Sequence, residues 1–166
     1  MVASIAIVQA INKITGLDPI IKWPNDILIK GKKICGILTE IDIKENIINY
    51  VIVGIGINVN NKINDEIKEI ATSLSFEVCS EISRMKLFKC IIEYFNKNYK
   101  NIINADFNTI KKLWSSYAQI IGKAVKIKDN GYTISGIISD IDENGYLILK
   151  NNDNIHKIIN GDIFYL

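Results

Sequence analysis

Apolar residues recur every three or four positions in three segments of the chain, which is the spacing of one face of a helix. This spacing is continuous from Ala3 to Ile14, and Gly16 follows it as a typical C-terminal cap. The same period runs through Ser80–Ile103, where one of the serines at the start is a suitable N-cap, and through Phe107–Tyr117. The sequence therefore predicts three helices, the first of them largely buried.

Shorter apolar segments rich in isoleucine and valine lie between the first and second predicted helices. Lys30-Gly31 and Lys44-Glu45-Asn46 separate neighbouring segments and are typical of tight turns. Strands joined by tight turns pair in an antiparallel sense. The sequence thus predicts one sheet built from Pro19–Trp23, Ile27–Ile29, Lys32–Ile43 and Ile47–Asn58.

The pattern changes after about Gly122, where short strands alternate with turn signals rich in asparagine, aspartate and glycine. Several strands in so short a segment predict a small β-barrel. We therefore expect two domains, residues 1–117 and residues 118–166, the first an α+β domain in which helices flank a mixed or antiparallel sheet. The turn signals are Asp129-Asn130-Gly131, Glu143-Asn144-Gly145, Asn151–Asn154 and Asn160-Gly161.

The composition is that of a folded protein with a small net charge. Of the 166 residues, 48% are apolar and 23% are charged, which is enough for a hydrophobic core. The 20 Lys and Arg residues against 18 Asp and Glu residues give a net charge of +2, too balanced to predict a nucleic-acid partner. The apolar run Val2–Ile11 is too short to span a membrane and lacks the basic flank of a signal peptide.

Cysteine and histidine give no sign of a metal centre. Cys35, Cys79 and Cys90 lie in apolar segments without CxxC spacing, which is typical of reduced thiols in a cytoplasmic protein. His156 is the single histidine. Without a Cys/His cluster we expect no structural zinc and no metal ligands among these side chains.

The predicted strand that ends at Asn58 has two very different faces, because side chains alternate along a strand. One face carries Gly54 and Gly56, and glycine inside a strand often marks a place where another group approaches the backbone closely. The other face is entirely β-branched, and we expect it in the core: Val51, Val53, Ile55, Ile57 and Val59.

The turns suggest how the neighbouring strands align with these glycines. A three-residue turn at residues 44–46 sets Gly36 opposite Gly54, and a two-residue turn at Lys30-Gly31 sets Asn25 opposite Gly36. The amide of Asn58 closes one end and can both donate and accept, as a nucleobase edge requires. The predicted alignment surrounds one open platform with Asn25, Gly36, Gly54, Gly56 and Asn58.

The segment Lys22-Trp23-Pro24-Asn25-Asp26 leads into this platform. Pro24 favours an extended Trp23, so that Lys22 and Trp23 point to opposite faces. With Trp23 packed inward, Lys22 points toward the platform, where an ammonium group needs a carboxylate or phosphate partner. Each feature also has a structural interpretation: paired glycines occur at bulges or against helices, lone lysines are usually solvated, and Asn25-Asp26 is a typical turn.

Together, KWPNDILIKGKKICGILTE at residues 22–40 and VIVGIGINVN at residues 51–60 resemble the catalytic core of biotin–protein ligases. The first helix, the ATSL segment at residues 71–74 and the helix after it also fit this family. Residues 122–150 resemble its small SH3-like C-terminal domain. The resemblance implies part of a class II aminoacyl-tRNA synthetase/biotin–protein ligase-like domain, followed by an SH3-like barrel.

The resemblance also implies a two-step reaction. Biotin and ATP, with Mg²⁺, give biotinyl-5′-AMP, and the biotinyl group then passes to a lysine on the biotin carrier domain of a biotin-dependent carboxylase. Lys22 matches the family's catalytic lysine, which contacts the biotin carboxyl group and the adenylate phosphate. The matching positions assign biotin binding to Lys22, Gly36, Ile37 and Leu38, and adenylate binding to Asn25, Asp26, Lys33, Gly56 and Asn58.

One part of the family pattern has no match. The family's upstream half carries a Gly/Arg-rich loop of the pattern GRGRxGR, whereas Arg84 is the single arginine of this sequence. We therefore expect little ligase activity from these 166 residues alone. The alternative is a non-catalytic fragment that binds partners or forms a homodimer through the sheet, as some family members do. Nucleic-acid binding by the C-terminal barrel is a weaker, third hypothesis.

Overall fold

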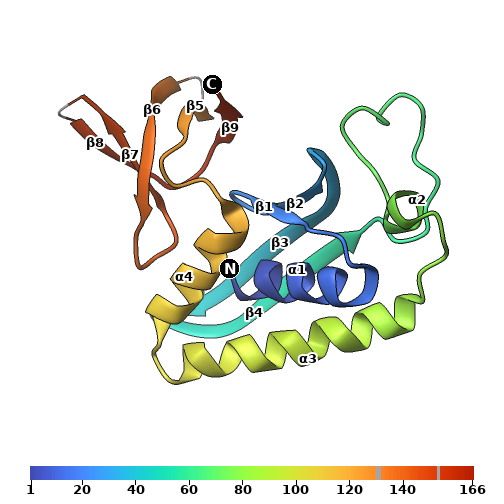
Figure 1. Ribbon diagram of the computed structural model, residues 1–166. Helices are drawn as coiled ribbons and strands as arrows, with labels where there is room; N and C mark the ends of the chain where they lie inside the picture. The colour runs from blue at the N-terminus through green and yellow to red at the C-terminus, as the bar shows by residue number, and fades with distance from the viewer. Residues whose placement is uncertain (130–131, 153) are drawn as a thin grey trace.

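The computed structural model describes residues 1–129, 132–152 and 154–166 of the chain. Two antiparallel sheets and four helices make up these residues (Figure 1). The helices are α1 (Val2–Thr15), α2 (Leu74–Val78), α3 (Arg84–Ile103) and α4 (Phe107–Ala118). The first sheet has the strand order β1 (Ile20–Lys22), β2 (Asp26–Ile29), β3 (Lys32–Lys44) and β4 (Ile47–Ile57). The predicted α+β class with antiparallel strands is confirmed.

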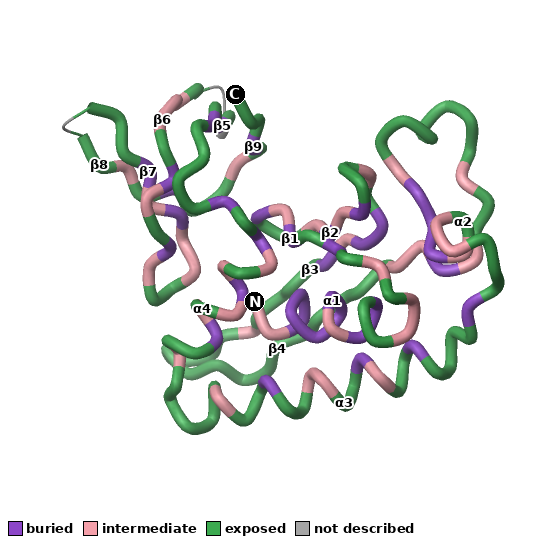
Figure 2. The backbone as a smooth tube through the Cα atoms, viewed as in Figure 1, coloured by how far each residue is buried: buried purple, intermediate pink, exposed green. Residues whose placement is uncertain are grey.

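Helix α1 forms the centre of the first domain's core. Eight of its residues are buried, and it packs against β1, β2 and the long helix α3 (Figure 2). Gly16 ends α1 with a left-handed φ of 72°, and its N–H donates to the Asn12 carbonyl oxygen at 2.8 Å. The predicted first helix and its glycine cap are confirmed.

Helix α3 begins at Arg84 rather than at Ser80, where the apolar spacing had placed its start. Ser83 is its N-cap, because the Ser83 hydroxyl accepts a hydrogen bond from the Lys86 N–H at 3.4 Å. The short helix α2 was not predicted. Among the described residues, no helix is both long enough and apolar enough to cross a bilayer.

Two residues, not three, close the hairpin between β3 and β4. Glu45 and Asn46 both have a positive φ, 50° and 63°, as a type I′ turn requires. A bulge at Asn49 of β4, opposite the bond between Asp42 and Ile43 of β3, then shifts the register. Gly36 therefore lies opposite Gly56, not opposite Gly54 as predicted, and both β4 glycines keep the predicted face.

A second bulge changes the alignment of β2 with β3. The turn at Lys30-Gly31 has the predicted two residues, but an extra residue enters β3 opposite the bond between Ile27 and Leu28. As a result Asp26, not Asn25, lies opposite Gly36. The prediction for Asn25 was wrong because nothing in the sequence signals a bulge at this position.

The β-branched face of β4 is not in the core, contrary to the prediction. Val51, Val53 and Ile55 are exposed and Ile57 is half-buried, whereas Val59 beyond the strand is buried. Strand β4 is the outer strand of the sheet, whereas the packing contacts of α1 are with β1 and β2 at the opposite side of the sheet. Alternation therefore gave the correct face, but at β4 that face borders a groove with α3 on its other side, so Val51 and Val53 stay exposed.

The second sheet contains the closing part of the chain, in the order β8, β7, β6, β5, β9. Its apolar residues Val125, Ile138 and Leu149 are fully buried. The described pairings leave β8 and β9 as the two ends of this sheet, so they do not close the barrel that the sequence predicted. The turn at Asn130-Gly131 and part of the one at Asn151–Asn154 fall outside the described residues. The strands are β5 (Ala124–Asp129), β6 (Tyr132–Ile141), β7 (Leu147–Asn151), β8 (Asn154–Ile158) and β9 (Asp162–Tyr165).

Candidate functional site

One residue from each strand of the first sheet lies in a single row across it. Lys22 on β1 pairs with Asp26 on β2, Asp26 with Gly36 on β3, and Gly36 with Gly56 on β4. Directly opposite residues of antiparallel strands point to the same face, so all four share one face of the sheet. In the structure the platform consists of this row and the adjacent pair Leu38 and Gly54; of the residues predicted to surround it, it keeps Gly36, Gly54 and Gly56.

The two β4 glycines leave the platform bare, and no packed neighbour requires them. A Cβ atom added at Gly54 would lie 3.7 Å from the Leu38 carbonyl oxygen. One added at Gly56 would lie 4.0 Å from the Gly36 carbonyl oxygen. The nearest atoms at both positions belong to the neighbouring strand at ordinary contact distances, so helix packing does not explain these glycines. The open space above both glycines agrees with the predicted close approach of another group to the backbone.

Lys22 lies in a cleft between the first sheet and the second. The cleft has a volume of 390 Å³ and is lined by residues 23–26 and by Lys128, Asn160 and Asp162, so it holds the carboxylates of Asp26 and Asp162. Lys22 is half-buried, and none of the ion pairs among the described residues involves it. A half-buried ammonium group outside these ion pairs fits the predicted anionic ligand.

Asp26 and Lys33, two of the predicted adenylate residues, form an ion pair with each other. The Lys33 Nζ lies 2.6 Å from the Asp26 Oδ1. A Cβ atom added at Gly36 would lie 3.3 Å from the Lys33 Cε and 3.7 Å from the Asp26 Oδ1. The missing side chain at Gly36 therefore gives this ion pair room to lie on the platform.

Asn25 holds the turn between β1 and β2 against β3. Its Nδ2 donates to the Ile37 carbonyl oxygen at 2.9 Å, and the Ile37 N–H donates to the Asn25 carbonyl oxygen at 2.9 Å. This pair of bonds fixes the position of the turn that follows Lys22. The contacts of Asn25 in the structure are thus with the protein backbone.

Replacing Asn25 by alanine removes the side-chain bond and leaves the Ile37 carbonyl oxygen with one partner fewer. We expect the free energy of unfolding to fall by about 1 kcal/mol, the usual contribution of one such bond. Urea denaturation followed by circular dichroism measures it. An unchanged midpoint would show that this amide does not stabilise the turn.

Ile37 and Leu38 lie on opposite faces of β3. Leu38 pairs with Gly54 on the platform and is 62% exposed. The Ile37 side chain is buried on the face that packs toward α1. Among the predicted biotin-binding residues, Leu38 therefore offers a side chain to the platform, and Ile37 can contribute only its main chain there.

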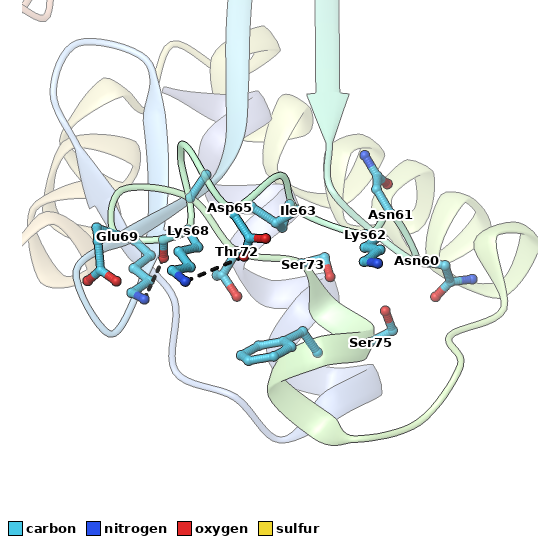
Figure 3. A pocket seen from close by; sticks show the side chains of 13 residues that line it. Asn60, Asn61, Lys62, Ile63, Asp65, Lys68, Glu69, Thr72, Ser73 and Ser75 are labelled. Atoms are coloured by element: carbon cyan, nitrogen blue, oxygen red, sulfur yellow. Dashed lines mark hydrogen bonds and ion pairs between the residues drawn. The ribbon is translucent and has the colours of Figure 1, made fainter.

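Asn58 follows β4 and connects the platform to a second cavity. Its N–H donates to the Ile34 carbonyl oxygen, and its Oδ1 accepts from the Asn61 Nδ2 at 3.1 Å. Asn61 lines a cavity of 530 Å³ formed by the loop after β4 and the start of α2. Polar side chains such as Asn60, Thr72 and Ser73 surround this cavity (Figure 3).

Neither these cavity residues nor the cleft residues of the second sheet were predicted from the sequence. Asn60 is the last residue of the GINVN motif. An asparagine in a loop usually indicates only a turn, so its contacts were not predicted. Asn60 Nδ2 donates to the Ile82 carbonyl oxygen at 2.9 Å, and the Ile82 N–H donates to the Asn60 Oδ1 at 3.0 Å. Likewise, Lys128 and Asp162 reach the cleft through domain packing, which no spacing in the sequence reveals.

Glu77 on α2 connects the loop that lines this cavity to the hairpin between β2 and β3, through contacts with Thr72 and Lys30. Its Oε2 lies 2.9 Å from the Lys30 Nζ, and its Oε1 accepts from the Thr72 hydroxyl at 2.7 Å. Burial acts to raise the pKa of Glu77, but the hydrogen bonds from Lys30 and Thr72 outweigh it and lower that pKa below its ordinary value of 4.5. Glu77 is therefore ionised and structural at neutral pH.

Because the pKa of Glu77 is lower in the folded chain than in the unfolded chain, the ionised side chain stabilises the fold above pH 4.5, and this contribution is lost as the pH falls. Replacing Glu77 by glutamine should lower the free energy of unfolding at neutral pH by about 1 kcal/mol, a modest value because Lys30 is exposed. Urea titrations at neutral and acidic pH should show the difference shrinking in acid. Glu66→Gln, at an exposed loop position, is the control. A difference that is the same at both pH values would contradict this role.

Cys35 lies directly below the platform, on the buried face of β3. Burial, with a smaller effect of the Asp26 charge, raises the pKa of the Cys35 thiol to about 12. The thiol is therefore protonated at neutral pH and is not a nucleophile for this site.

Two family models match the chain. Residues 1–58 match the biotin/lipoate A/B protein ligase family, and residues 120–166 match the biotin protein ligase C-terminal domain. The platform lies within the first match, and the second match coincides with the second sheet.

Curated relatives and solved structures point in the same direction. The chain is 43% identical to the bifunctional ligase/repressor BirA of Bacillus subtilis (strain 168), over 98% of this chain and 51% of that protein. It is 27% identical to the biotin–[acetyl-CoA-carboxylase] ligase of Mycobacterium tuberculosis, over 100% of this chain and 61% of that protein. The biotin protein ligase of Aquifex aeolicus in complex with biotin and ATP superposes with a TM-score of 0.82 at 27% identity, covering 99% of this chain and 69% of that chain. The chain thus spans about half to two thirds of the length of the relatives it matches.

Proposed function

Because the chain belongs to the biotin–protein ligase family, we propose that its platform binds the reacting groups when biotin is activated with ATP to biotinyl-5′-AMP. One observation carries the proposal: Lys22, Asp26, Gly36 and Gly56 form an unbroken row across four strands. The row begins at a lysine that forms no ion pair within the described part of the chain and ends in bare backbone. The neighbour in complex with biotin and ATP supports the same substrates.

Lys22 has the chemistry that the first step requires. A biotin carboxylate oxygen attacks the α-phosphorus of ATP, the bond to the bridging oxygen breaks, and pyrophosphate leaves. Two anions must meet in this step, and a fixed ammonium group stabilises the charge that develops between them. Lys22 then acts by electrostatics and positioning, with no covalent bond to the substrate.

The glycines give the acyl-adenylate room to lie against the backbone. Biotin binding is assigned to Lys22, Gly36 and Leu38 and to the main chain of Ile37. The adenylate extends along Gly56 toward Asn58 and the cavity beyond it, with the Asp26–Lys33 pair at its side. In the second step a lysine amine of the carrier domain of a biotin-dependent carboxylase attacks the acyl carbon, and AMP leaves. The names of the relatives support a carboxylase as acceptor.

Mg²⁺ fits this site as a partner of the nucleotide. Among the described residues no three His, Cys, Asp or Glu side chains gather into a metal-binding group. Mg²⁺ usually keeps several waters and binds through substrate phosphates, so the phosphate oxygens of ATP would hold it here. Its charge would neutralise the leaving pyrophosphate, while Lys22 acts at the carboxylate and α-phosphate.

We propose a catalytic part at residues 1–117 and an SH3-like domain at residues 118–166, in a cytoplasmic protein. The second domain contributes Lys128 and Asp162 to the cleft at Lys22. A non-catalytic role in dimerisation or partner binding is the second candidate, and the exposed outer strand β4 is the observation that favours it.

Biotin-dependent exchange between ATP and labelled pyrophosphate tests the proposed reaction. We define the completed ligase as this chain joined in one polypeptide to the segment of the Bacillus subtilis relative that it does not match. The completed ligase should catalyse the exchange, and the 166-residue chain alone should be slower by about 100-fold or more, because its platform is open to water. A folded completed ligase without exchange would contradict the proposed function. Equal rates would contradict the need for the second segment.

A further inference from the structure

Trp23, the residue after Lys22, contacts the second sheet. Its side chain is 4% exposed, and its indole N–H donates to the Gly145 carbonyl oxygen at 3.4 Å. Gly145 lies in the turn between β6 and β7. Because Lys22 and Trp23 are consecutive, the place of the indole ring constrains the backbone from which the Lys22 side chain extends.

The strand that carries Lys22 has little other support. Strand β1 is three residues long and pairs with β2 alone. Within the described part of the chain, two side-chain hydrogen bonds join residues 1–118 to the second sheet: Trp23 to Gly145, and Lys111 Nζ to Asp140 Oδ2 at 2.8 Å. The second bond starts from α4, so the Trp23 bond is the one that reaches the end of β1.

Asp142 gives the turn between β6 and β7 its shape. Its Oδ1 accepts from the N–H groups of Asn144 and Tyr146, each at 2.9 Å, and its Oδ2 lies 2.6 Å from the Lys157 Nζ on β8. The Gly145 N–H donates to the Asp142 carbonyl oxygen at 3.0 Å, with Gly145 at a left-handed φ of 85°. One carboxylate thus fixes the loop that presents the Gly145 carbonyl oxygen to Trp23.

The charge of Asp142 is part of this arrangement. The hydrogen bond from Lys157, together with those from the Tyr146 and Asn144 backbone, holds the pKa of Asp142 below its ordinary value of 3.8. The carboxylate is therefore ionised at neutral pH, and all of its described partners lie in the second sheet or its turns.

We infer that Asp142 is a positioning residue for Lys22: it shapes the turn, the turn holds the Trp23 indole, and the indole fixes the backbone at Lys22. This role rests on the proposed function, in which the Lys22 ammonium group stabilises charge at the biotin carboxylate and the α-phosphate. Stabilisation of this kind needs a cation held in place, and a displacement of about 1 Å from a remote change can cost about 100-fold in rate. The second sheet then supports the reaction without touching the substrate.

Asp142→Ala in the completed ligase tests this role. Single-turnover formation of the adenylate, with biotin and ATP at saturation, should slow by about tenfold, because Lys22 is less well placed. The dissociation constant for biotin should change by less than about threefold, since the platform itself is intact. Asp142→Asn keeps an oxygen that accepts from the two backbone N–H groups, and should restore the rate to within about threefold of the unsubstituted protein.

Combining Asp142→Ala with Lys22→Ala separates positioning from general support of the fold. If Asp142 acts through Lys22, its substitution should slow the Lys22→Ala protein by less than about twofold more. Losses that multiply would overturn the inference. Lys22→Ala at the full rate would refute the proposed function, whereas a slow Lys22→Ala protein beside a fast Asp142→Ala protein would refute the positioning role alone.

Asp140→Ala is the matched control, because it removes an ion pair from the same strand two residues away, at a site without contact to Trp23. Its rate should stay within about twofold. In ¹H–¹⁵N NMR the Trp23 indole N–H signal, assigned by its loss in Trp23→Phe, should move in Asp142→Ala and stay in place in Asp140→Ala. An unmoved signal in Asp142→Ala, or an equal loss of rate in Asp140→Ala, would overturn the inference.

Trp23→Phe decides the question if Asp142→Ala fails to fold, because phenylalanine keeps an aromatic ring in the core and removes only the N–H donor. Adenylate formation should slow by about threefold or more, with less than about twofold further slowing in the Lys22→Ala protein. A full rate in a folded Trp23→Phe protein would contradict the role of the indole bond.

Discussion

Replacing Lys22 by alanine in the completed ligase is expected to slow biotinyl-adenylate formation by about 100-fold, because the cation at the reacting carboxylate and phosphate is lost. The thermal unfolding temperature should stay within about 2 °C, since Lys22 is half-buried and has no ion pair among the described residues. Single-turnover formation of the adenylate, with biotin and ATP at saturation, separates this loss from weaker binding.

Lys150→Ala is the matched control for Lys22, because it removes a lysine from an exposed position of β7, outside the residues that line the cleft. It should leave the rate unchanged. If Lys22→Ala keeps the full rate, Lys22 has no part in the reaction. If it unfolds the protein instead, Lys22 is a structural residue and the site must be sought elsewhere.

Replacing Gly56 by valine is expected to weaken binding of the adenylate without lowering the free energy of unfolding. Nothing lies closer than 4.0 Å to an added Cβ atom, and valine favours strands. The free energy of unfolding should therefore stay constant or rise by up to about 1 kcal/mol. The valine side chain would occupy the place proposed for the adenylate, and the affinity for a non-hydrolysable biotinyl-adenylate analogue should fall by about 100-fold. Calorimetric titration of the completed ligase measures it.

Ile52→Phe is the control for Gly56→Val, because it adds bulk to the same face of β4 at an exposed position farther along the strand. It should leave the affinity within about twofold. A large loss of stability in Gly56→Val, with no loss of affinity in the molecules that remain folded, would show that the glycine serves packing rather than ligand binding.

Local patterns in the sequence predicted the three longer helices and the faces of the strand glycines. Gly16 and the apolar period gave α1 with its cap, and Ser83 was one of two candidate caps for α3. The faces of Gly54 and Gly56 followed from alternation alone, since a shift of two residues leaves a side chain on the same face. Lys22 also reached the platform face as predicted.

Register and burial were predicted less well, because both depend on contacts that no local pattern encodes. The bulge opposite Ile27 moved Asp26, in place of Asn25, to the position opposite Gly36. The exposure of Val51 and Val53 depends on which elements cover β4, and alternation gives the face of a side chain but not its cover. The cleft residues of the second domain come from domain packing, which sequence spacing does not reveal.

We propose that an acyl-adenylate lies on the row from Lys22 to Gly56. Two-dimensional ¹H–¹⁵N NMR of the completed ligase, titrated with the non-hydrolysable biotinyl-adenylate analogue, tests it residue by residue. We predict saturable shifts of the backbone amides of Lys22, Gly36, Gly54 and Gly56. Shifts confined to the second sheet, or saturable binding that leaves these four amides unmoved, would contradict the account.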